Sequence, residues 1–366
     1  MAGTLTGLAA FSDSYAEARG KFLASAREAG AALHELRHPA TGPQGEALAL
    51  DVAVIGRSQA PRVLLAGCGT HGIEGYCGSA AMTGWLASGA ARRLPHEVAA
   101  VLLHANNPWG FAHKARVTEE NVDLNRNFAP HNGAYPPNPG YAELHAIVTP
   151  ESWDDASVAE VFRGVDAFRE RVGEQAYSDA MNGGQYSHAD GIFFGGHRAQ
   201  WSNRALVDAI ATHAGHARQL AYVDFHTGIG AFAEHVFLCF HQKGSPAWER
   251  ARAWWGERAV NRAGVTHKAV ASYQGLLVDA LEGLLPRAET ASVAVEFGTR
   301  ERREMQRSII GERWRRVHGA KQPELARREH ERFVEAFYPS EPRWREAVLE
   351  QSREVLERAV SGLAQA

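Results

Sequence analysis

Short apolar runs that alternate with helix-like segments constrain the fold of this chain more than any other feature of its sequence. Six runs have the length and composition of β-strands, at residues 47–55, 62–66, 98–104, 220–225, 235–240 and 292–297. Helix-like segments separate most of them, at residues 4–37, 74–89, 152–171, 203–216, 246–263 and 309–361. Such alternation is typical of an α/β fold, in which helices cover both faces of a central sheet. We therefore predict a mixed, mostly parallel sheet flanked by helices, with helical extensions at both ends of the chain.

No break in composition divides the chain. The sequence has 366 residues, of which 45% are hydrophobic, enough for a sizeable buried core. We predict one domain over residues 1–366, with a catalytic core at about 45–300 and a helical C-terminal extension at about 301–366. Residues 106–150 are rich in Asn, Pro and Gly and are predicted to form a long ordered loop region, which is usually functional.

The overall charge gives no reason to expect a polyanionic partner. A formal net charge of −3 disfavours nucleic acid and anionic membranes. The N-terminus lacks a basic region followed by an apolar core, and no apolar run has the roughly 18 residues of a membrane helix. The three cysteines form no disulfide framework or zinc-knuckle spacing and are expected to be packed and reduced. We expect a cytoplasmic protein, and the sequence does not predict its oligomeric state.

Metal-ligand residue types follow two of the predicted strands. His71 and Glu74 are three residues apart at the start of the helix that follows the 62–66 strand, so both side chains lie on one side and suit zinc at about 2 Å. His226 ends another strand, and Asp224 could orient its ring. Each residue also has a simpler structural interpretation. Glu74 would be a glutamate at a helix N-terminus that the helix dipole favours, and His226 would be a hydrogen-bonded core histidine.

A third predicted strand ends in a carboxylate. Glu296 closes the apolar run 292–297, where a charge is costly to bury without a partner or a role. A glutamate beside a metal can act as general base towards water and then as general acid towards the leaving nitrogen. The alternative is a structural salt bridge with Arg300 or Arg302.

Two loops are candidates for substrate contact. The segment 115–128 carries polar side chains and two arginines, which suit a carboxylate and a developing oxyanion, although it could equally be a surface loop. The segment 182–197 is rich in glycine and carries Tyr186, Phe193 and Phe194. We predict that it forms a pocket wall or a lid, the alternative being a surface loop with partly buried aromatic residues.

Taken together, these motifs resemble the zinc carboxypeptidase superfamily, which includes carboxypeptidase A-like peptidases and the succinylglutamate desuccinylase/aspartoacylase branch. The similar stretches are Gly69-Thr-His-Gly-Ile-Glu74, Asn107-Pro-Trp-Gly-Phe111, Arg116 with Asp123-Leu-Asn-Arg-Asn-Phe128, Asp224-Phe-His226 and Val295-Glu296. They cover residues from about 60 to 300, and Asp123 to Phe128 is the most specific of them. The chain looks like a bacterial subfamily: Asp224-Phe-His226 followed by Thr-Gly is similar to the deacylase branch, whereas the C-terminal region is helical rather than strand-rich.

The resemblance implies a role for each of these residues. It implies one zinc ion per chain bound by His71, Glu74 and His226. It implies Glu296 as general base and Arg116 as the group that polarises the scissile carbonyl. It also implies that Asn125 and Arg126 bind the free carboxylate of the substrate, and Tyr273 loosely matches the tyrosine that closes over substrate in carboxypeptidases.

We therefore predict a zinc-dependent hydrolase that cleaves an amide bond next to a free carboxylate in a small N-acyl amino acid or short peptide. One alternative is an exo-acting metallocarboxypeptidase on longer peptides, and another is a non-catalytic binding protein that keeps the fold. The stretch Gly67-Cys-Gly-Thr-His-Gly72 also fits a dinucleotide fingerprint, but no acidic residue ends the next predicted strand. A serine hydrolase is disfavoured because no Gly-x-Ser-x-Gly motif occurs.

Overall fold

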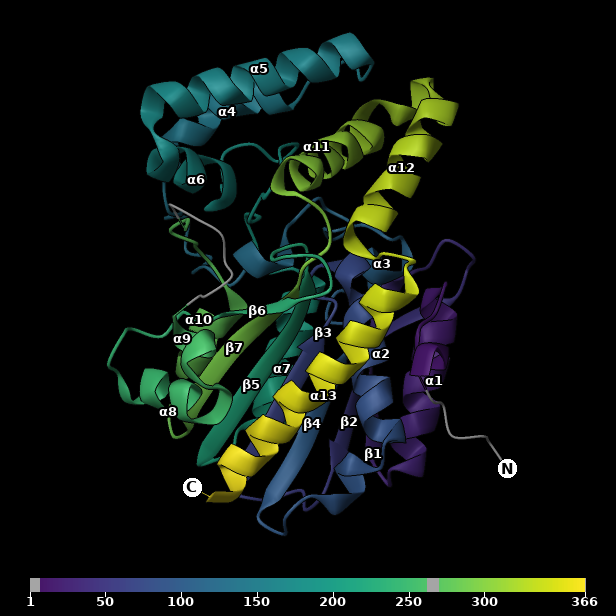
Figure 1. The fold of residues 1–366 in the computed structure, drawn as a ribbon, viewed down its shortest axis with the longest axis vertical. Coiled ribbons are helices and arrows are strands. Elements are labelled where there is room, and N and C mark those ends of the chain that lie inside the picture. Colours follow the sequence, from purple (N-terminus) through teal and green to yellow (C-terminus); the bar gives the residue numbers. More distant parts are fainter. Residues whose placement is uncertain (1–6, 262–269, 366) are drawn as a thin grey trace.

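A seven-stranded mixed sheet forms the centre of the molecule in a computed structural model that describes residues 7–261 and 270–365 (Figure 1). The strands are β1 (Ala32–Thr41), β2 (Ala47–Ile55), β3 (Arg62–Cys68), β4 (Val98–His104), β5 (Gln219–Thr227), β6 (His235–Leu238) and β7 (Glu289–Phe297). Their order is β1-β2-β4-β3-β5-β7-β6. The four central strands β4, β3, β5 and β7 run parallel, and the outer strands pair antiparallel. The predicted mixed, mostly parallel sheet is confirmed.

Helices cover both faces of this sheet. The described helices are α1 (Tyr15–Glu28), α2 (Gly75–Ala87), α3 (Pro108–Ala112), α4 (Pro139–Val148), α5 (Asp155–Val172), α6 (Glu174–Asn182), α7 (Trp201–Ala214), α8 (Pro246–Trp255), α9 (Glu257–Val260), α10 (Leu277–Leu284), α11 (Arg302–His318), α12 (Pro323–Phe337) and α13 (Pro342–Gln365). One core joins α1, α2, α8 and α13 to the first face, and a second joins α7 and α10 to the opposite face. Strand β4 is buried along its whole length, which explains why the central strands are continuously apolar in the sequence.

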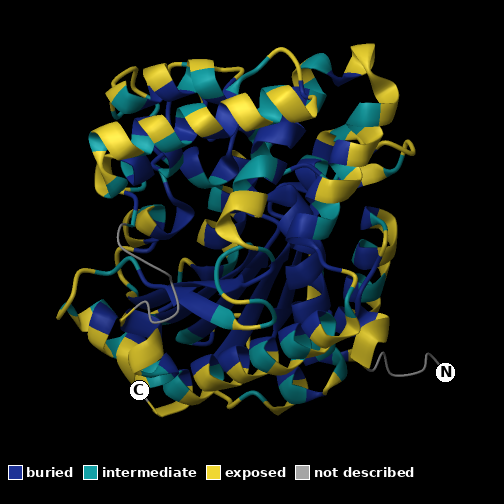
Figure 2. Ribbon diagram, turned by 45° about the horizontal axis from the view of Figure 1, so that its top comes forward, coloured by how far each residue is buried: buried dark blue, intermediate teal, exposed yellow. Residues whose placement is uncertain are grey.

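A third group of helices lies beyond one end of the sheet rather than on a face. Helices α4, α5, α6, α11 and α12 stand above the sheet in Figure 1, and we call them the helical roof. Helices α4, α5, α6 and α11 share a separate buried core that includes Tyr141, Phe168 and Trp314. Their outward faces are exposed, whereas the region between roof and sheet is buried (Figure 2). The carboxyl ends of β3, β5 and β7 point towards this buried region.

The N-terminal region differs from the sequence-based expectation. Residues 4–37 were expected to be helical, but only α1 is, and the chain then forms β1 at the sheet edge; residues 4–6 lie outside the described part. Seven register pairs with β2, including Leu33↔Ala53 and Leu36↔Leu50, hold this segment as a strand. Tertiary pairing therefore overrides the helix propensity of Ala, Leu and Glu.

The middle and C-terminal regions also differ in detail. The segment 106–150 contains α3 and α4, each opened by an Asn-Pro pair whose asparagine caps the helix. Helices α6 and α10 were not expected at all. The C-terminal helices are present, but α11 and α12 belong to the roof and α13 packs on the sheet, so they are integral to the fold.

In the described part of the chain, no helix combines the length and the apolar character needed to cross a bilayer. The cytoplasmic location stays a prediction.

Candidate metal centre

Three potential ligands meet where β3 and β5 end. His71 follows β3 and its turn leads through Gly72–Glu74 into α2, whereas His226 is the penultimate residue of β5. The turn needs glycine at Gly72, because a Cβ there would lie 2.0 Å from the carbonyl carbon of Gly110. Since β3 and β5 are parallel neighbours, their carboxyl ends bring the two histidines to the same edge of the sheet.

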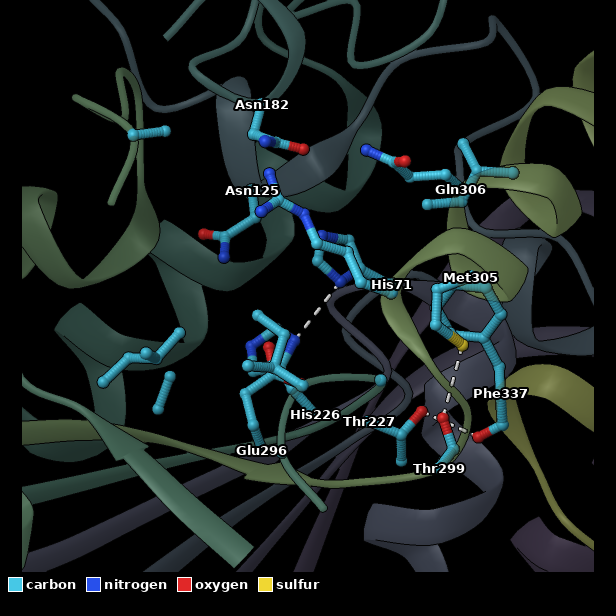
Figure 3. Close-up of a pocket in the computed structure, with 18 of the residues that line it drawn as sticks. His71, Asn125, Asn182, His226, Thr227, Glu296, Thr299, Met305, Gln306 and Phe337 are labelled. Atoms are coloured by element: carbon cyan, nitrogen blue, oxygen red, sulfur yellow. Dashed lines mark hydrogen bonds between the residues drawn. The ribbon is translucent and has the colours of Figure 1, made fainter. Parts of the chain in front are cut away.

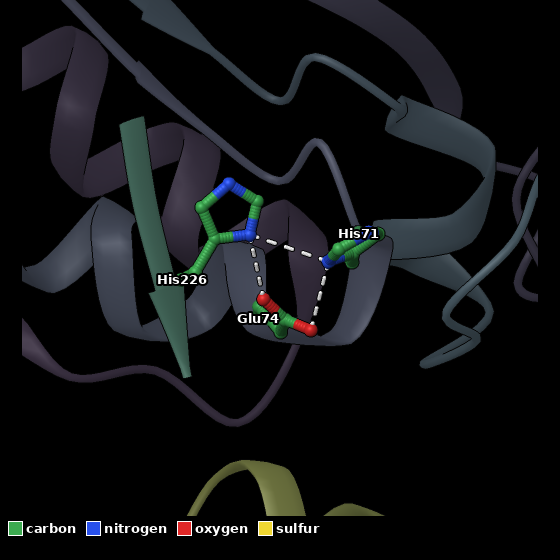
Figure 4. A group of neighbouring side chains, drawn as sticks. All are labelled: His71, Glu74 and His226. Atoms are coloured by element: carbon green, nitrogen blue, oxygen red, sulfur yellow. Dashed lines mark hydrogen bonds and ion pairs between the residues drawn. The ribbon is translucent and has the colours of Figure 1, made fainter. Parts of the chain in front are cut away.

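The distances between these side chains suit one metal ion (Figure 4). Nδ1 of His71 lies 3.0 Å from Oε1 of Glu74 and 3.2 Å from Nδ1 of His226, whose Nδ1 lies 3.0 Å from Oε2 of Glu74. Two ligands at 2.0–2.1 Å from a tetrahedral zinc ion are about 3.3 Å apart, close to these values. They form the single cluster of this kind among the described residues, and all three are buried. The donor set therefore fits a metal.

Neighbouring carboxylates orient both imidazole rings. Nε2 of His226 lies 2.8 Å from Oδ2 of Asp224, as the sequence suggested, and Nε2 of His71 lies 3.2 Å from Oδ1 of Asp123. Each contact favours the tautomer that protonates Nε2 and leaves Nδ1 free to bind metal. Burial alone would raise the pKa of Asp123, but the charges of His71 and Arg116 and of nearby Arg126 lower it well below its usual range.

Glu296 lies beside the cluster because β7 pairs with β5 in parallel. The register places Glu296 directly opposite His226 (Figure 3). Its side chain is buried, and Oε2 has no hydrogen-bond partner among the described residues. Burial is the main reason that the pKa of Glu296 is raised to about 7, and the charge of Glu74 adds to it. The alternative of a salt bridge does not apply: Arg300 pairs with Glu335 and Glu341, and Arg302 pairs with Glu174.

Arg116 reaches the same cluster from the loop 115–128. Its guanidinium donates to Oε1 of Glu74 at 2.9 Å and to Oδ2 of Asp123 at 3.3 Å, and Nη2 lies 2.8 Å from Nε2 of His71. Because a guanidinium only donates, its contact with His71 and the contact of Asp123 with the same nitrogen require opposite tautomers. The arrangement that suits a metal is the one in which His71 donates to Asp123 and Arg116 turns elsewhere.

Arg126 and Asn125 lie further along the cavity. Arg126 is 4% exposed and donates to the main-chain oxygens of Asn125 and Asn182 at 2.8 and 2.9 Å. It forms no salt bridge within the described residues, and its Nε has no partner there. The Asn125 side-chain oxygen accepts from the Leu277 N–H at 3.1 Å, which leaves its NH₂ group as the donor. Tyr273 also lines the cavity, with its ring 4.9 Å from the Arg126 guanidinium carbon.

The Gly-rich segment 182–197 forms part of the cavity wall, as predicted, but not through Tyr186. Phe193 lines the cavity with its ring 5.2 Å from the Arg116 guanidinium carbon and 5.7 Å from that of Arg126. Tyr186 is not among the lining residues; it lies behind Arg126 and donates to its main-chain oxygen at 2.6 Å. Glycine allows this close packing, because a Cβ at Gly195 would lie 2.1 Å from the Tyr186 ring. Tyr186 therefore supports the position of Arg126 rather than facing the cavity.

These groups share one cavity of about 920 Å³ between the sheet and the helical roof. Figure 3 shows Asn182 and Gln306 across the cavity from His226 and Glu296, with Met305 and Phe337 at the side. The sequence did not identify Asp123 as a partner of His71, although it lies in the most specific motif. It also did not identify the roof residues Asn182 and Gln306, which no local pattern distinguishes.

Comparison with solved structures gives similar folds at low identity. Bovine thrombin-activatable fibrinolysis inhibitor, in complex with a tick carboxypeptidase inhibitor, matches with a TM-score of 0.54 and 12% identity, over 96% of this chain and 97% of that chain. A metallo-carboxypeptidase from Burkholderia cenocepacia matches with a TM-score of 0.45 and 13% identity, over 93% and 68% of the chains. A succinylglutamate desuccinylase from Chromobacterium violaceum matches with a TM-score of 0.38 and 16% identity, over 83% and 73%. The first match shows that this chain has the zinc carboxypeptidase-like fold.

Comparison by sequence points to one family. Among curated proteins nothing matches. The family described as "Protein of unknown function (DUF2817)" matches residues 11–351. Because this match spans most of the chain and all the residues of the cluster, the protein belongs to the DUF2817 family.

Proposed function

We propose that this protein is a zinc-dependent hydrolase that cleaves an amide bond next to a free carboxylate, in a small N-acyl amino acid or short peptide. The fold is that of metal-dependent hydrolases, and His71, Glu74 and His226 provide a donor set that suits zinc. The observation that carries the carboxylate requirement is Arg126, a buried cation in the wall of the same cavity that forms no salt bridge among the described residues.

The residues divide the chemistry between them. A bound zinc ion would supply a Lewis acid next to the scissile carbonyl and would make water more acidic. Oε2 of Glu296 is buried without a hydrogen-bond partner in the described chain, so it is free to take a proton from water and pass it to the leaving nitrogen. Arg116 is placed to donate to the developing oxyanion once one of its N–H groups turns from Glu74.

The carboxylate would lie further along the cavity. A guanidinium is expensive to bury alone, and its planar donors match a carboxylate. Arg126 and the NH₂ group of Asn125 would bind it, with Tyr273 against the guanidinium. An internal peptide bond has no free carboxylate that could reach Arg126 while the bond lies at the metal cluster, so the enzyme would act only at a chain end or on a small amide.

The helical roof favours short substrates over long peptides. Ser178, Asn182, Gln306 and Ile309 of the roof line the cavity opposite the metal cluster, so the acyl side of a substrate meets protein. Exo-acting cleavage of longer peptides is the second candidate. The rest of a longer substrate would then extend out of the cavity past Phe232 and Arg300, which also line it. A purely binding function would not require Glu296 beside a complete ligand set.

Blocking the substrate carboxylate should strongly impair cleavage. Conversion of a good substrate to its C-terminal amide or methyl ester removes the anion that Arg126 would pair with. Loss of a buried charge-assisted pair costs about 2 kcal/mol or more, so kcat/KM should fall by roughly thirtyfold or more. Substrates come from a mass-spectrometric screen of N-acyl amino acids and short peptides with the zinc-loaded protein.

The matching variant is Arg126→Lys, which keeps the charge but loses the fork geometry. It should cleave the free acid less well while its activity on the methyl ester changes little. Equal kcat/KM for the acid and the ester in the unmodified protein would disprove the carboxylate anchor, but not the hydrolase itself.

Truncation of Phe193 should weaken substrate binding more than it slows turnover. The ring packs against both Arg116 and Arg126, and an apolar group at this position would strengthen the interaction of each guanidinium with an anion. We expect Phe193→Ala to raise KM about tenfold, with a smaller change in kcat, and Phe193→Tyr to restore most of the affinity. The control is Phe194→Leu in the same loop, since Phe194 does not line the cavity. Unchanged KM in Phe193→Ala would show that the loop is only structural.

A further inference from the structure

A second, much smaller cavity lies behind the candidate active site, beneath the helical roof. Its volume is about 30 Å³, room for a single small ion or about one water molecule. Three arginines and several apolar side chains line it, among them Arg116, Arg313, Arg316, Ile192, Ile309 and Phe333. Arg116 and Phe193 also line the large cavity, so the two cavities share a wall.

One guanidinium in this cavity has donors that nothing in the described chain satisfies. Arg313 is 6% exposed, and it uses Nε and Nη2 to bind the main-chain oxygen and the carboxylate of Asp190 at 2.9 and 2.7 Å. Its Nη1 is buried and has no hydrogen-bond partner among the described residues. A buried, charged donor without an acceptor is costly, so this atom indicates an acceptor that is not part of the chain.

Most of the charges around the cavity are paired within the described chain. Arg116 is paired with Glu74 and Asp123, and Arg313 is paired with Asp190. Glu312 also lines the cavity, but both its oxygens are bound by Arg315, at 2.7 and 2.6 Å. Each of these charged groups therefore has an ionic partner within the chain.

Arg316 is the cation that remains. It is half-buried, donates to the side-chain oxygen of Asn121 at 3.1 Å and lies over the Trp109 ring, with no salt bridge among the described residues. Burial is the main reason that its pKa is lowered; the nearby charge of Glu312 opposes this shift and the charge of Arg315 adds to it.

We propose that this cavity binds one small monovalent anion of the size of chloride, held by Arg313 and Arg316. The site combines one arginine that forms no salt bridge among the described residues, one unsatisfied buried donor and a small volume, and its apolar walls suit a weakly hydrated ion. The small volume favours a small ion over a larger anion such as sulfate. The anion would fix α11, which carries both arginines, against the two loops that carry Asn121 and Phe193. The proposal does not depend on the catalytic function.

Thermal unfolding in chloride tests the proposal. Sodium chloride is exchanged for sodium gluconate at constant ionic strength, because gluconate cannot enter the cavity. Binding to the folded state should raise Tm in a saturable way, by roughly 1–3 °C at ten times the dissociation constant. Arg316→Met should lose this dependence, because the remaining charges are paired. Arg303→Met is the matched control on α11, since Arg303 is exposed and pairs with Asp166 outside the cavity; it should keep the dependence.

A crystallographic measurement decides the matter if Arg316→Met does not fold. Crystals of the unmodified protein in bromide should give an anomalous peak in the cavity, next to Nη1 of Arg313. A Tm that does not depend on chloride, a chloride dependence that persists in Arg316→Met, or a cavity with water and no anomalous peak would each overturn the proposal.

Discussion

Replacement of Glu296 with glutamine is expected to lower kcat by about 10²-fold or more while the bound metal is retained. Glutamine keeps the size and burial of the side chain but cannot accept a proton at Oε2. Oε2 is the oxygen that has no hydrogen-bond partner in the described chain, so no other interaction is lost with the charge. Because Glu296 is not one of the three clustered ligands, metal content by mass spectrometry should not change.

The matched control for this prediction is on the same strand. Glu289 begins β7, is exposed and pairs with Arg250, so Glu289→Gln should leave kcat unchanged. If Glu296→Gln retains full turnover on an identified substrate, Glu296 is not the general base. If it instead loses metal, Glu296 acts through the ligand cluster.

Replacement of His226 with alanine is expected to remove most of the bound metal and with it the activity. His226 is one of three ligands, and the remaining Glu74 and His71 would offer only two. The substitution also leaves the buried carboxylates of Asp224 and Glu74 without this partner, so some loss of stability is expected as well. Metal content after dialysis and circular dichroism separate these two effects.

A second variant, with a smaller expected effect on metal affinity, tests the same assignment. Asp224→Asn keeps the side-chain size but weakens the bond that orients His226, and metal affinity should fall by about 10–100-fold without loss of the site. His235→Ala is the control, since His235 lies on β6 and its ring contacts Gln351 rather than the cluster. Full zinc occupancy in His226→Ala would contradict the assignment of the metal centre.

Several expectations from the sequence stay predictions. The roles of Glu296, His226 and Arg126 are open to the experiments above. The assignment of residues 1–366 to one domain, the identity of the metal as zinc and the roles of the other site residues are expectations from the sequence. The exclusion of nucleic acid and membrane partners rests on the sequence alone. The oligomeric state is not predicted by either the sequence or the fold.

The sequence by itself determined the central strands of the sheet and the clustering of His71, Glu74 and His226. The strands that carry His71, His226 and Glu296 are continuously apolar because they are buried on both faces, and this makes their ends recognisable. Parallel neighbours then bring their carboxyl ends together, so residues distant in the chain become adjacent through a rule that needs no coordinates. The pairing of Asp224 with His226 could also be predicted, since residues two positions apart on a strand lie on the same face.

Only the tertiary structure decided what surrounds the cluster. Residues 32–37 of β1 were expected to be helical, since they have helix propensity and only the pairing with β2 makes them part of a strand. Phe193 rather than Tyr186 faces the cavity because packing against Arg126 and the glycines sets the loop, and no periodic pattern encodes such packing. Helices far apart in the sequence bring the roof residues Asn182 and Gln306 to the cavity and enclose the small cavity beneath α11. These helices pack together without the regular register of a sheet. Sheet pairing follows a simple geometric rule that can be applied to a sequence, whereas the packing of irregular loops and helices depends on the shapes of many side chains at once.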